Sequence, residues 1–252
     1  MNALAGTGAV VIPAYNEARS IRDVARRALA QAPLVIVVDD GSTDGTAAEL
    51  DGLPVFVLRH PANRGKAASL RSGADEAIRR GATAIFTLDG DGQHRPEDIP
   101  LLADVYVAKP GSIVIGSRLH ARAEIPPARY WANRFANFWI GWAAGYAIAD
   151  SQSGFRIYPA ALFARAKVNY DEAHSFVFES EILIEAARLG VYASCVPISV
   201  IYSSSARRSH FRPVVDIARI VRMVAWRLLA RGLYLQGLVR SFGELPGDER
   251  RT

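Results

Sequence analysis

The sequence is poor in cysteine. Cys195 is the only cysteine among 252 residues, which excludes an intramolecular disulfide framework and suits a reducing compartment. Cys195 lies in the apolar run 191–196, so we interpret it as a small buried side chain and not as a nucleophile. Classes of protein that depend on disulfide bonds are therefore excluded.

Long hydrophobic runs are absent as well. No window of about 18 uncharged apolar residues occurs, so we expect no transmembrane helix. The nearest approach, residues 135–149, has no charge but is too short and contains Gly141 and Gly145. No basic region precedes the first apolar stretch, so we expect no signal peptide. These absences predict a cytoplasmic protein.

Acidic residues are fewer than basic ones. The chain has 25 Asp and Glu against 30 Lys and Arg, a net charge of +5. A basic balance suits anionic partners such as nucleoside diphosphates or phospholipid headgroups. No recognised nucleic-acid module accompanies this charge, so we expect no nucleic-acid partner. Half of the residues are hydrophobic, which excludes disorder, and the length fits one large α/β domain or two small ones.

Apolar runs alternate with helical patterns over the first 118 residues. Strands are predicted at residues 9–12, 34–38, 55–58, 84–88 and 113–116. Helices are predicted at residues 17–32 and 66–80, and a short helix begins at Pro96. This alternation is typical of a doubly wound, mostly parallel α/β sheet of the Rossmann-like kind.

Polar motifs follow three of these strands, at residues 13–17, 39–46 and 89–94. In open parallel sheets, ligands bind beyond the carboxyl ends of the strands. Because the three motifs fall at such ends, we expect them to form one site. A set of unrelated turns would not be expected to fall there each time.

The third motif, Asp89-Gly90-Asp91-Gly92-Gln93-His94, carries the most chemical information. Alternate side chains of an extended chain point the same way, so Asp89, Asp91 and Gln93 can converge on one point. Their hard oxygen atoms suit Mg²⁺ or Mn²⁺, which commonly hold a phosphate or diphosphate. A simple acidic turn without metal is the alternative.

The pattern changes after residue 118. We predict an aromatic helix at 129–149, a helix at 179–189, a strand at 191–202 and a basic amphipathic helix at 214–238. The tail is rich in Pro, Gly and charge, which favours disorder. We therefore divide the chain into a main α/β domain at 1–212, a basic amphipathic helical extension at 213–242 and a disordered tail at 243–252.

Four motifs in order resemble the inverting family 2 glycosyltransferases with a GT-A fold. They are Val11-Ile12-Pro13-Ala14-Tyr15-Asn16-Glu17, the stretch 37–46, Asn63-Arg64-Gly65-Lys66, and the Asp89 motif. Later stretches at 116–118, 150–156, 178–183 and 196–198 look like the branch that includes dolichyl-phosphate mannose synthase and bacterial polyprenyl-phosphate sugar transferases. The resemblance covers roughly residues 9–202. It implies transfer of a sugar from a UDP- or GDP-sugar to a lipid phosphate.

The resemblance also implies roles for individual residues. The loop and strand residues that resemble the nucleotide pocket are Pro13, Tyr15, Glu17, Val38 and Asp40. The residues that resemble the metal and diphosphate site are Asp89, Asp91 and Gln93, with Gly90 allowing close backbone approach. Basic residues expected near the diphosphate or the acceptor phosphate are Arg118 and Arg156, and acidic residues expected on the acceptor side are Asp150 and Glu181. For Lys66, phosphate contact and helix capping both stay open.

The nature of the acceptor stays open. A phosphate acceptor is already ionised and needs no general base, whereas a hydroxyl of a glycolipid or polysaccharide would need Asp150 or Glu181 as a base. The chain departs from the branch at 202–213, where the register of the basic residues differs. Phosphate contact there could come from Arg207, Arg208, His210 or Arg212. A nucleotide-sugar-binding protein without catalysis is a third reading, disfavoured by the intact Asp89 and Asp91.

Membrane contact would have to come from amphipathic surface. The predicted helix 214–238 combines arginines with Trp226, which fits an anionic membrane surface, and packing on the domain is the alternative. The aromatic segment 131–146 is a second candidate, for which we favour burial in the core. With a lipid-linked acceptor, these features predict a peripheral protein at the inner face of the membrane.

Overall fold

The computed structural model describes residues 7–122, 125–170, 177–199 and 213–243. The predicted disordered tail lies outside these residues except for Gly243. The basic stretch that contains Arg207, Arg208, His210 and Arg212 also lies outside them.

A seven-stranded sheet with the order β3-β2-β1-β4-β6-β5-β7 forms the centre of the molecule. Its strands are β1 (Gly8–Ala14), β2 (Leu34–Asp39), β3 (Phe56–Arg59), β4 (Ala84–Thr87), β5 (Ile113–Ser117), β6 (Arg156–Pro159) and β7 (Ala193–Pro197). All neighbouring strands are parallel except where β6 pairs with β4 and β5. The mostly parallel α/β sheet expected from the sequence is confirmed.

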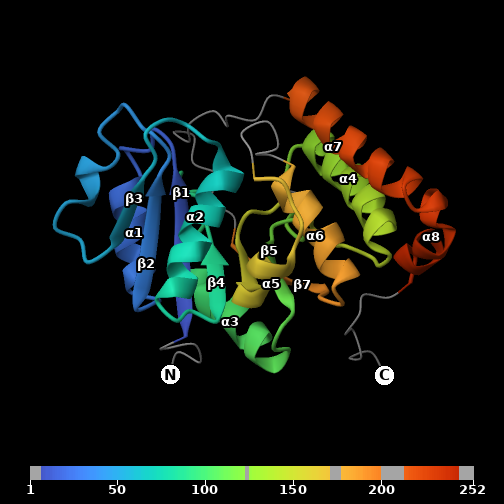
Figure 1. The fold of residues 1–252 in the computed structure, drawn as a ribbon, viewed down its shortest axis with the longest axis horizontal. Helices are drawn as coiled ribbons and strands as arrows, with labels where there is room; N and C mark the ends of the chain where they lie inside the picture. Colours follow the sequence, from blue (N-terminus) through green and yellow to red (C-terminus); the bar gives the residue numbers. More distant parts are fainter. Residues whose placement is uncertain (1–6, 123–124, 171–176, 200–212, 244–252) are drawn as a thin grey trace.

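Helices cover both faces of the sheet (Figure 1). Val10 and Ile12 of β1 pack with α1 (Ile21–Leu29), whereas Val11 faces α2 (Lys66–Arg79). Alternate side chains of β1 point to opposite faces of the sheet, and a helix covers each face. The strand is therefore buried on both sides, which explains why it has no polar residues. Gly73 allows α2 to lie close to β1, since a Cβ there would be 2.3 Å from Val11 Cγ1.

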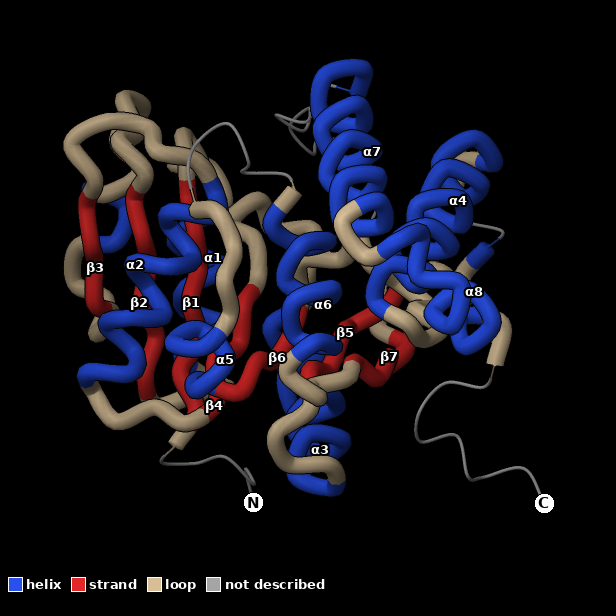
Figure 2. Tube along the Cα trace, turned by 45° about the vertical axis from the view of Figure 1, so that its right-hand side comes forward, coloured by secondary structure: helices blue, strands red, loops and turns tan. Residues whose placement is uncertain are grey.

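The second half of the chain adds further helices around β5, β6 and β7. They are α3 (Ile99–Ala108), α4 (Pro127–Ala144), α5 (Ala160–Arg165) and α6 (Phe178–Arg188), followed by α7 (Pro213–Leu229) and α8 (Leu235–Ser241). Figures 1 and 2 show α4, α7 and α8 grouped at the end of the molecule opposite β3. The long connections therefore build a helical layer beyond the sheet.

The single helix predicted at 214–238 is wrong in its extent. The structure ends α7 at Leu229 and begins α8 at Leu235. Gly232, Leu233 and Tyr234 between them all have positive φ angles, which a continuous right-handed helix does not allow. The indole Nε1 of Trp142 on α4 donates to the carbonyls of Leu233 and Tyr234 at 3.0 and 3.2 Å, which satisfies the carbonyls of the break.

The aromatic segment of α4 is divided between core and surface. Ile140 is buried and Trp139 and Trp142 pack partly against the core, but Trp131 and Phe135 are 60% and 61% exposed. Burial of the whole segment, which the sequence favoured, is therefore wrong for its first two turns. No helix in the described part of the chain is long and apolar enough to cross a membrane.

Candidate functional site

Two loops at the carboxyl ends of β1 and β2 are locked together by hydrogen bonds. The Asn16 amide donates to Ser42 Oγ at 2.8 Å, and the Glu17 amide donates to Thr46 Oγ1 at 2.8 Å. In return, the Thr43 amide donates to Asn16 Oδ1 at 2.8 Å. Asn16 reaches this geometry through a φ of 56°. Sequence reasoning assigned no role to Asn16, although Asn is among the residues that tolerate this conformation.

The motifs at 13–17 and 39–46 therefore form one joined loop structure, which contains Tyr15 and Glu17, at the carboxyl ends of β1 and β2. Asp44 strengthens it, because its carboxylate accepts hydrogen bonds from the Ala18 amide at 3.1 Å and the Thr46 amide at 3.0 Å. Asp44 thus stabilises the turn.

Asp40 is fully engaged inside the protein. Its carboxylate pairs with His60 Nδ1 at 2.6 Å and accepts the amides of Arg64 and Gly65 at 3.0 and 2.8 Å. The side chain is buried and ties β2 to the loop that begins α2. This arrangement does not support the expected contact between Asp40 and a nucleobase, because the carboxylate is buried and already has three partners in the protein.

The neighbouring Asp39 is better placed for such a contact. Its Oδ1 accepts the Ser42 amide at 2.9 Å, as a loop cap would. Its Oδ2 has no hydrogen-bond partner among the described residues, and Arg59 Nε lies 3.3 Å away as a charge partner only. Asp39 itself is fully buried, but its ion-pair partner Arg59 lines a cavity of about 440 Å³ together with Gly41, Ser42, Thr43, His60 and Pro61. Of the two neighbouring carboxylates, Asp39 is therefore the one that keeps an oxygen without a hydrogen-bond partner among the described residues.

Val38 and Gly90 both pack against protein atoms. Val38 is buried under α2 in the core. A Cβ at Gly90 would lie 3.2 Å from Ile21 Cδ1 and 3.3 Å from the Pro13 carbonyl oxygen, and Ser20 Oγ donates to the Gly90 carbonyl at 2.7 Å. These placements do not support direct contact with a nucleotide, since strand alternation turns Val38 away and Gly90 serves the packing of α1 on β1.

An ion-pair network lies at the carboxyl end of β4. Lys66 Nζ contacts Asp89 Oδ1 at 2.5 Å and Glu179 Oε1 at 2.9 Å. Burial favours the neutral amine, but the charges of Asp89 and Glu179 prevail and hold the pKa of Lys66 above its usual value. Burial likewise opposes ionisation of Asp89, yet the Lys66 charge lowers the pKa of Asp89 to about 2. Both groups are therefore charged at neutral pH.

Asp91 responds in the opposite direction. Burial and the negative charge of Asp89 raise the pKa of Asp91. Its Oδ1 accepts the Gln93 amide at 2.9 Å, which forms the turn after Asp91. Two carboxylates held this close repel each other, and a cation between them would relieve that repulsion.

His94 is buried against the ring of Phe155, with 5.4 Å between ring centroids. Burial lowers the pKa of His94 to about 3, so its imidazole is neutral. Neither ring nitrogen has a hydrogen-bond partner among the described residues, and Nδ1 lies 3.9 Å from Asp89 Oδ2. His94 is therefore packed between Phe155 and the Asp89 turn.

The donor set fits a divalent cation that is shared with a phosphate. Within the described ranges, no group of three or more His, Cys, Asp or Glu side chains is placed so that it could hold a metal ion by itself. Mg²⁺, however, is often held by one or two carboxylates together with phosphate oxygens of the substrate. Asp89 and Asp91 offer such carboxylates, and the charge of Asp89 acts on the pKa of Asp91.

Arg118 belongs to the same cluster. Its charge acts on the pKa of Asp89, Asp91 and His94, which places it near the Asp89 motif. Arg118 and Lys66 are thus the two cations whose charges act on both Asp89 and Asp91.

Arg156 and Asp150 hold a buried loop instead of facing a cleft. The Arg156 guanidinium is buried and donates to the carbonyls of Ser153, Ser151 and Glu179 at 2.6, 2.8 and 2.8 Å. Asp150 is also buried, and its carboxylate accepts Ser117 Oγ at 2.9 Å and two amides of its own loop. Direct contact of either with a substrate is not supported, because their hydrogen-bonding groups are used by the protein.

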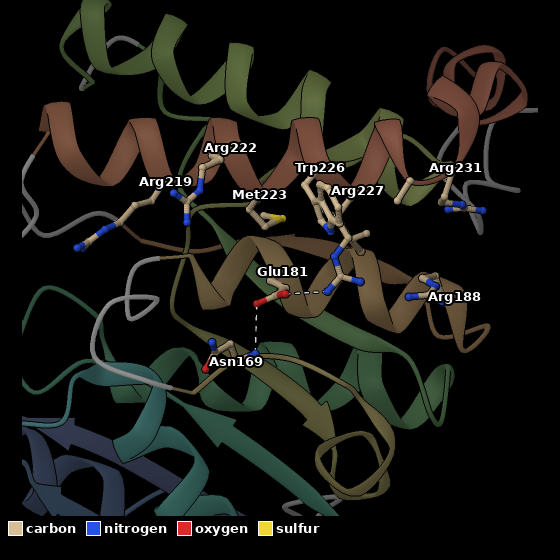
Figure 3. Close-up of a pocket in the computed structure, with 11 residues that line it drawn as sticks. Asn169, Glu181, Arg188, Arg219, Arg222, Met223, Trp226, Arg227 and Arg231 are labelled. Carbon is tan, nitrogen blue, oxygen red and sulfur yellow. Dashed lines mark hydrogen bonds and ion pairs between the residues drawn. The ribbon is translucent and has the colours of Figure 1, made fainter.

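Glu179 and Glu181 point to different regions although both lie in the first turn of α6. Glu179 reaches Lys66, whereas Glu181 pairs with Arg227 on α7 at 2.7 Å and accepts the Asn169 amide at 3.4 Å (Figure 3). Residues two apart on a helix are rotated by about 200°, so only one could face the Asp89 motif. Sequence reasoning chose Glu181, and nothing in the sequence distinguishes Glu179.

Comparison with known proteins agrees with this geometry. Residues 9–169 match the family described as Glycosyl transferase family 2. The chain is 29% identical over 201 residues to the polyprenol monophosphomannose synthase of Mycolicibacterium smegmatis, covering 75% of this chain and 76% of that protein. It is 27% identical over 236 residues to the undecaprenyl-phosphate mannosyltransferase of Micrococcus luteus, covering 88% and 94%.

The fold matches a solved structure of glucosyl-3-phosphoglycerate synthase from Mycobacterium tuberculosis in complex with Mn²⁺ and uridine-diphosphate-glucose. The TM-score is 0.62 at 21% identity, and the match covers 91% of this chain and 80% of that one. This likeness confirms the fold expected from the sequence.

Proposed function

Because the chain belongs to glycosyl transferase family 2, we propose that this glycosyltransferase moves a sugar from a UDP- or GDP-sugar to a polyprenyl phosphate, with inversion at the anomeric carbon. The observation that carries the proposal is the meeting of Asp89, Asp91, Lys66 and Arg118 at the carboxyl end of β4. The names of two relatives, a polyprenol monophosphomannose synthase and an undecaprenyl-phosphate mannosyltransferase, support the lipid-phosphate acceptor.

The nucleoside end of the donor binds near the carboxyl ends of β2 and β3. Asp39 Oδ2 accepts an N–H of the base, a role that its lack of a hydrogen-bond partner among the described residues supports. The loop that holds Tyr15 and Glu17 is fixed by Ser42 and Thr46, so it orients the ribose without reordering. The adjoining cavity has room for the base.

The diphosphate end lies beside the Asp89 motif. Asp89 and Asp91 hold a Mg²⁺ or Mn²⁺ ion that stabilises the negative charge of the leaving diphosphate. Lys66 and Arg118 orient the phosphates and stabilise the same charge. Glu179 keeps Lys66 in place through its 2.9 Å ion pair. Arg156 acts indirectly, because its hydrogen bonds fix the 151–153 backbone and the start of α6.

The state of the predicted bases favours a phosphate acceptor over a hydroxyl. A hydroxyl would need a carboxylate to remove its proton. Asp150 is occupied by three donors, and Glu181 is paired with Arg227. A phosphate is already ionised at neutral pH and can attack the anomeric carbon from the face opposite the leaving diphosphate.

The acceptor lipid brings the enzyme to a membrane surface. We propose that α4 and α8 contact that surface through their exposed apolar side chains. Those side chains are Trp131, Phe135, Phe138, Leu235, Val239 and Phe242. Aromatic side chains favour the boundary between lipid and water, and α4, α7 and residues 230–243 carry seven arginines against one acidic residue, Asp216.

A thermal-stabilisation screen with UDP- and GDP-sugars, with and without Mn²⁺, tests the donor site. We expect a metal-dependent rise in melting temperature with one donor, abolished in Asp91→Ala and retained in the control Asp23→Ala on the surface of α1. A chain that responds to no nucleotide sugar under any condition would overturn the proposal.

Incubation of the labelled donor with polyprenyl phosphate tests the acceptor. We expect a lipid product that releases its sugar in mild acid, as a phosphate-linked sugar does. A product that survives mild acid would assign the sugar to a hydroxyl, and Glu179 would then be the carboxylate to test as a base.

A further inference from the structure

A groove between α6 and α7 lies apart from the donor site. Its volume is about 670 Å³, and five arginines contribute to its lining (Figure 3). They are Arg188, Arg219, Arg222, Arg227 and Arg231. No residue that we assign to the donor site lines it. The first turn of α6 separates the two sites, with Glu179 facing one and Glu181 facing the other.

Among the described residues, five arginines line the groove and two carboxylates pair with them, and Arg219 has a further interaction of its own. Arg227 pairs with Glu181 at 2.7 Å and with Glu185 at 3.0 Å, and Arg188 also contacts Glu185 at 3.1 Å. Two buried carboxylates thus face five arginines. Arg222 has no ion-pair partner in the described part of the chain, and it is exposed.

Apolar side chains complete the groove. Met223 lies among the arginines of α7, and Trp226 is 70% exposed at the edge. Leu229, one turn further along α7, is 64% exposed. A lining of this kind suits a ligand with an anionic head and an apolar body, because guanidinium groups bind phosphate oxygens and tryptophan prefers the lipid–water boundary.

We propose that this groove binds the phosphate headgroup of an anionic phospholipid in the bilayer. It thereby anchors α7 to the membrane while the donor site stays free for catalysis. The inference rests on the proposed function, because a lipid acceptor requires the enzyme to work at a membrane. It adds a second phosphate site whose ligand is not a reactant.

Vesicle co-sedimentation of the full chain tests the site. The vesicles contain phosphatidylcholine alone or with phosphatidylglycerol. We expect binding to depend on phosphatidylglycerol, and Arg222→Gln/Arg231→Gln to weaken that binding about tenfold or more. The matched control is Arg26→Gln/Arg79→Gln, which removes the same charge from exposed positions on α1 and α2. Equal weakening in both double variants would overturn the proposal, because binding would then follow net charge and not the groove.

A second arm separates the bilayer lipid from the acceptor. Transfer to detergent-solubilised polyprenyl phosphate should be unchanged in Arg222→Gln/Arg231→Gln, and the donor-dependent rise in melting temperature should be retained. If the double variant instead loses transfer while binding phosphatidylglycerol vesicles normally, the groove serves the acceptor and the proposal is wrong. If neither the unaltered chain nor the double variant transfers sugar but the vesicle result holds, the proposed function is wrong, while the assignment of the groove to a lipid headgroup is retained.

The exposed side chain of Trp226 allows a further test of the lipid assignment. Trp226→Ala should weaken binding to phosphatidylglycerol vesicles, and inorganic phosphate at millimolar concentration should not compete. Complete competition by inorganic phosphate would identify a site for free anions and overturn the assignment to a lipid headgroup.

Discussion

The donor site and the groove between α6 and α7 both carry charge, but they hold it in different ways. At the donor site, the loops after β1 and β2 exchange short hydrogen bonds, and Lys66 is held between Asp89 and Glu179. Along the groove, arginines outnumber carboxylates and large apolar side chains such as Trp226 are exposed. The first region is organised before its ligand arrives, whereas the second is left open.

The ligands that we propose for the two regions account for this difference. A reacting diphosphate must be held to within a fraction of an ångström, so a fixed set of charges in a buried setting is effective. A membrane surface has no fixed geometry, so an excess of flexible cations and aromatic side chains is sufficient. Changes in the two regions should therefore affect different measurements.

Asp91→Asn should give the largest effect. We expect kcat to fall about 10²–10³-fold, because a ligand of the cation that stabilises the leaving group is lost. The melting temperature without ligand should stay the same or rise, since burial and Asp89 already disfavour the charged form of Asp91. Steady-state kinetics and calorimetry check both parts, with Asp23→Asn as the control. A large drop in stability would show that Asp91 is structural.

Arg227→Met should chiefly affect folding. The change leaves Glu181 without its arginine and Glu185 with only Arg188, and both carboxylates are almost fully buried. We expect a loss of about 2–3 kcal/mol in the free energy of unfolding, somewhat less than for a fully buried pair. Urea titration measures it.

The triple variant Arg227→Met/Glu181→Gln/Glu185→Gln is the control for this change. It should recover most of the loss, because the uncompensated charges are gone. Without that recovery, the effect of Arg227 would lie in packing and not in charge.

Gly154→Ala should affect the donor site with little change in stability. A Cβ at this position would lie 2.7 Å from Lys66 Nζ and 3.1 Å from Asp89 Oδ2. The flexible lysine can move, so we expect less than about 1 kcal/mol in stability but about a tenfold loss of donor affinity. Titration calorimetry with the nucleotide measures the affinity.

Gly73→Ala supplies the contrast, because its Cβ would meet the core side chain of Val11. That variant should lose about 1–3 kcal/mol of stability with unchanged donor affinity. Identical behaviour of the two alanine variants would contradict the separation of packing from donor binding.

Glu97→Gln should give the smallest effect, and one that depends on pH. The hydrogen bond from Arg27 at 2.6 Å lowers the pKa of Glu97 to about 2. A lowered pKa stabilises the fold above the ordinary pKa of the carboxyl group, and the contribution disappears as the pH falls towards 2. Since the pair is partly exposed, we expect about 0.5 kcal/mol at pH 7. Thermal unfolding of both proteins from pH 7 to pH 2.5 should show the curves converging, and a constant difference would exclude the ion pair as the cause.

Sequence patterns were sufficient to predict features that depend on residues close together in the chain. Strand alternation and the positions of glycine and proline predicted the order of elements through residue 118, and polar motifs at strand ends predicted where the site lies. Sequence patterns could not distinguish between two adjacent residues of the same type when only one of them is engaged by the protein. Asp39 and Asp40 are adjacent, and only the position of His60 and of the Arg64 and Gly65 amides shows that Asp40 is used internally.

Long-range contacts explain the other differences. Arg156 looks like a phosphate ligand in sequence, yet β6 runs antiparallel between β4 and β5 and carries its guanidinium inward to carbonyls of the 150–154 loop and of α6. Strand direction of this kind depends on the whole topology. For the same reason the break between α7 and α8 could not be predicted, because Trp142 on a distant helix stabilises it.

The sequence by itself determined the family, the sheet and the acidic motif after β4, because periodicity and short motifs encode local geometry. Tertiary structure alone decided which carboxylates are engaged by the protein and which keep an oxygen without a hydrogen-bond partner among the described residues, since this depends on backbone donors supplied by segments far apart in the chain. It also decided that aromatic residues of α4 and arginines of α7 lie on the surface, because burial is a property of the assembled layers.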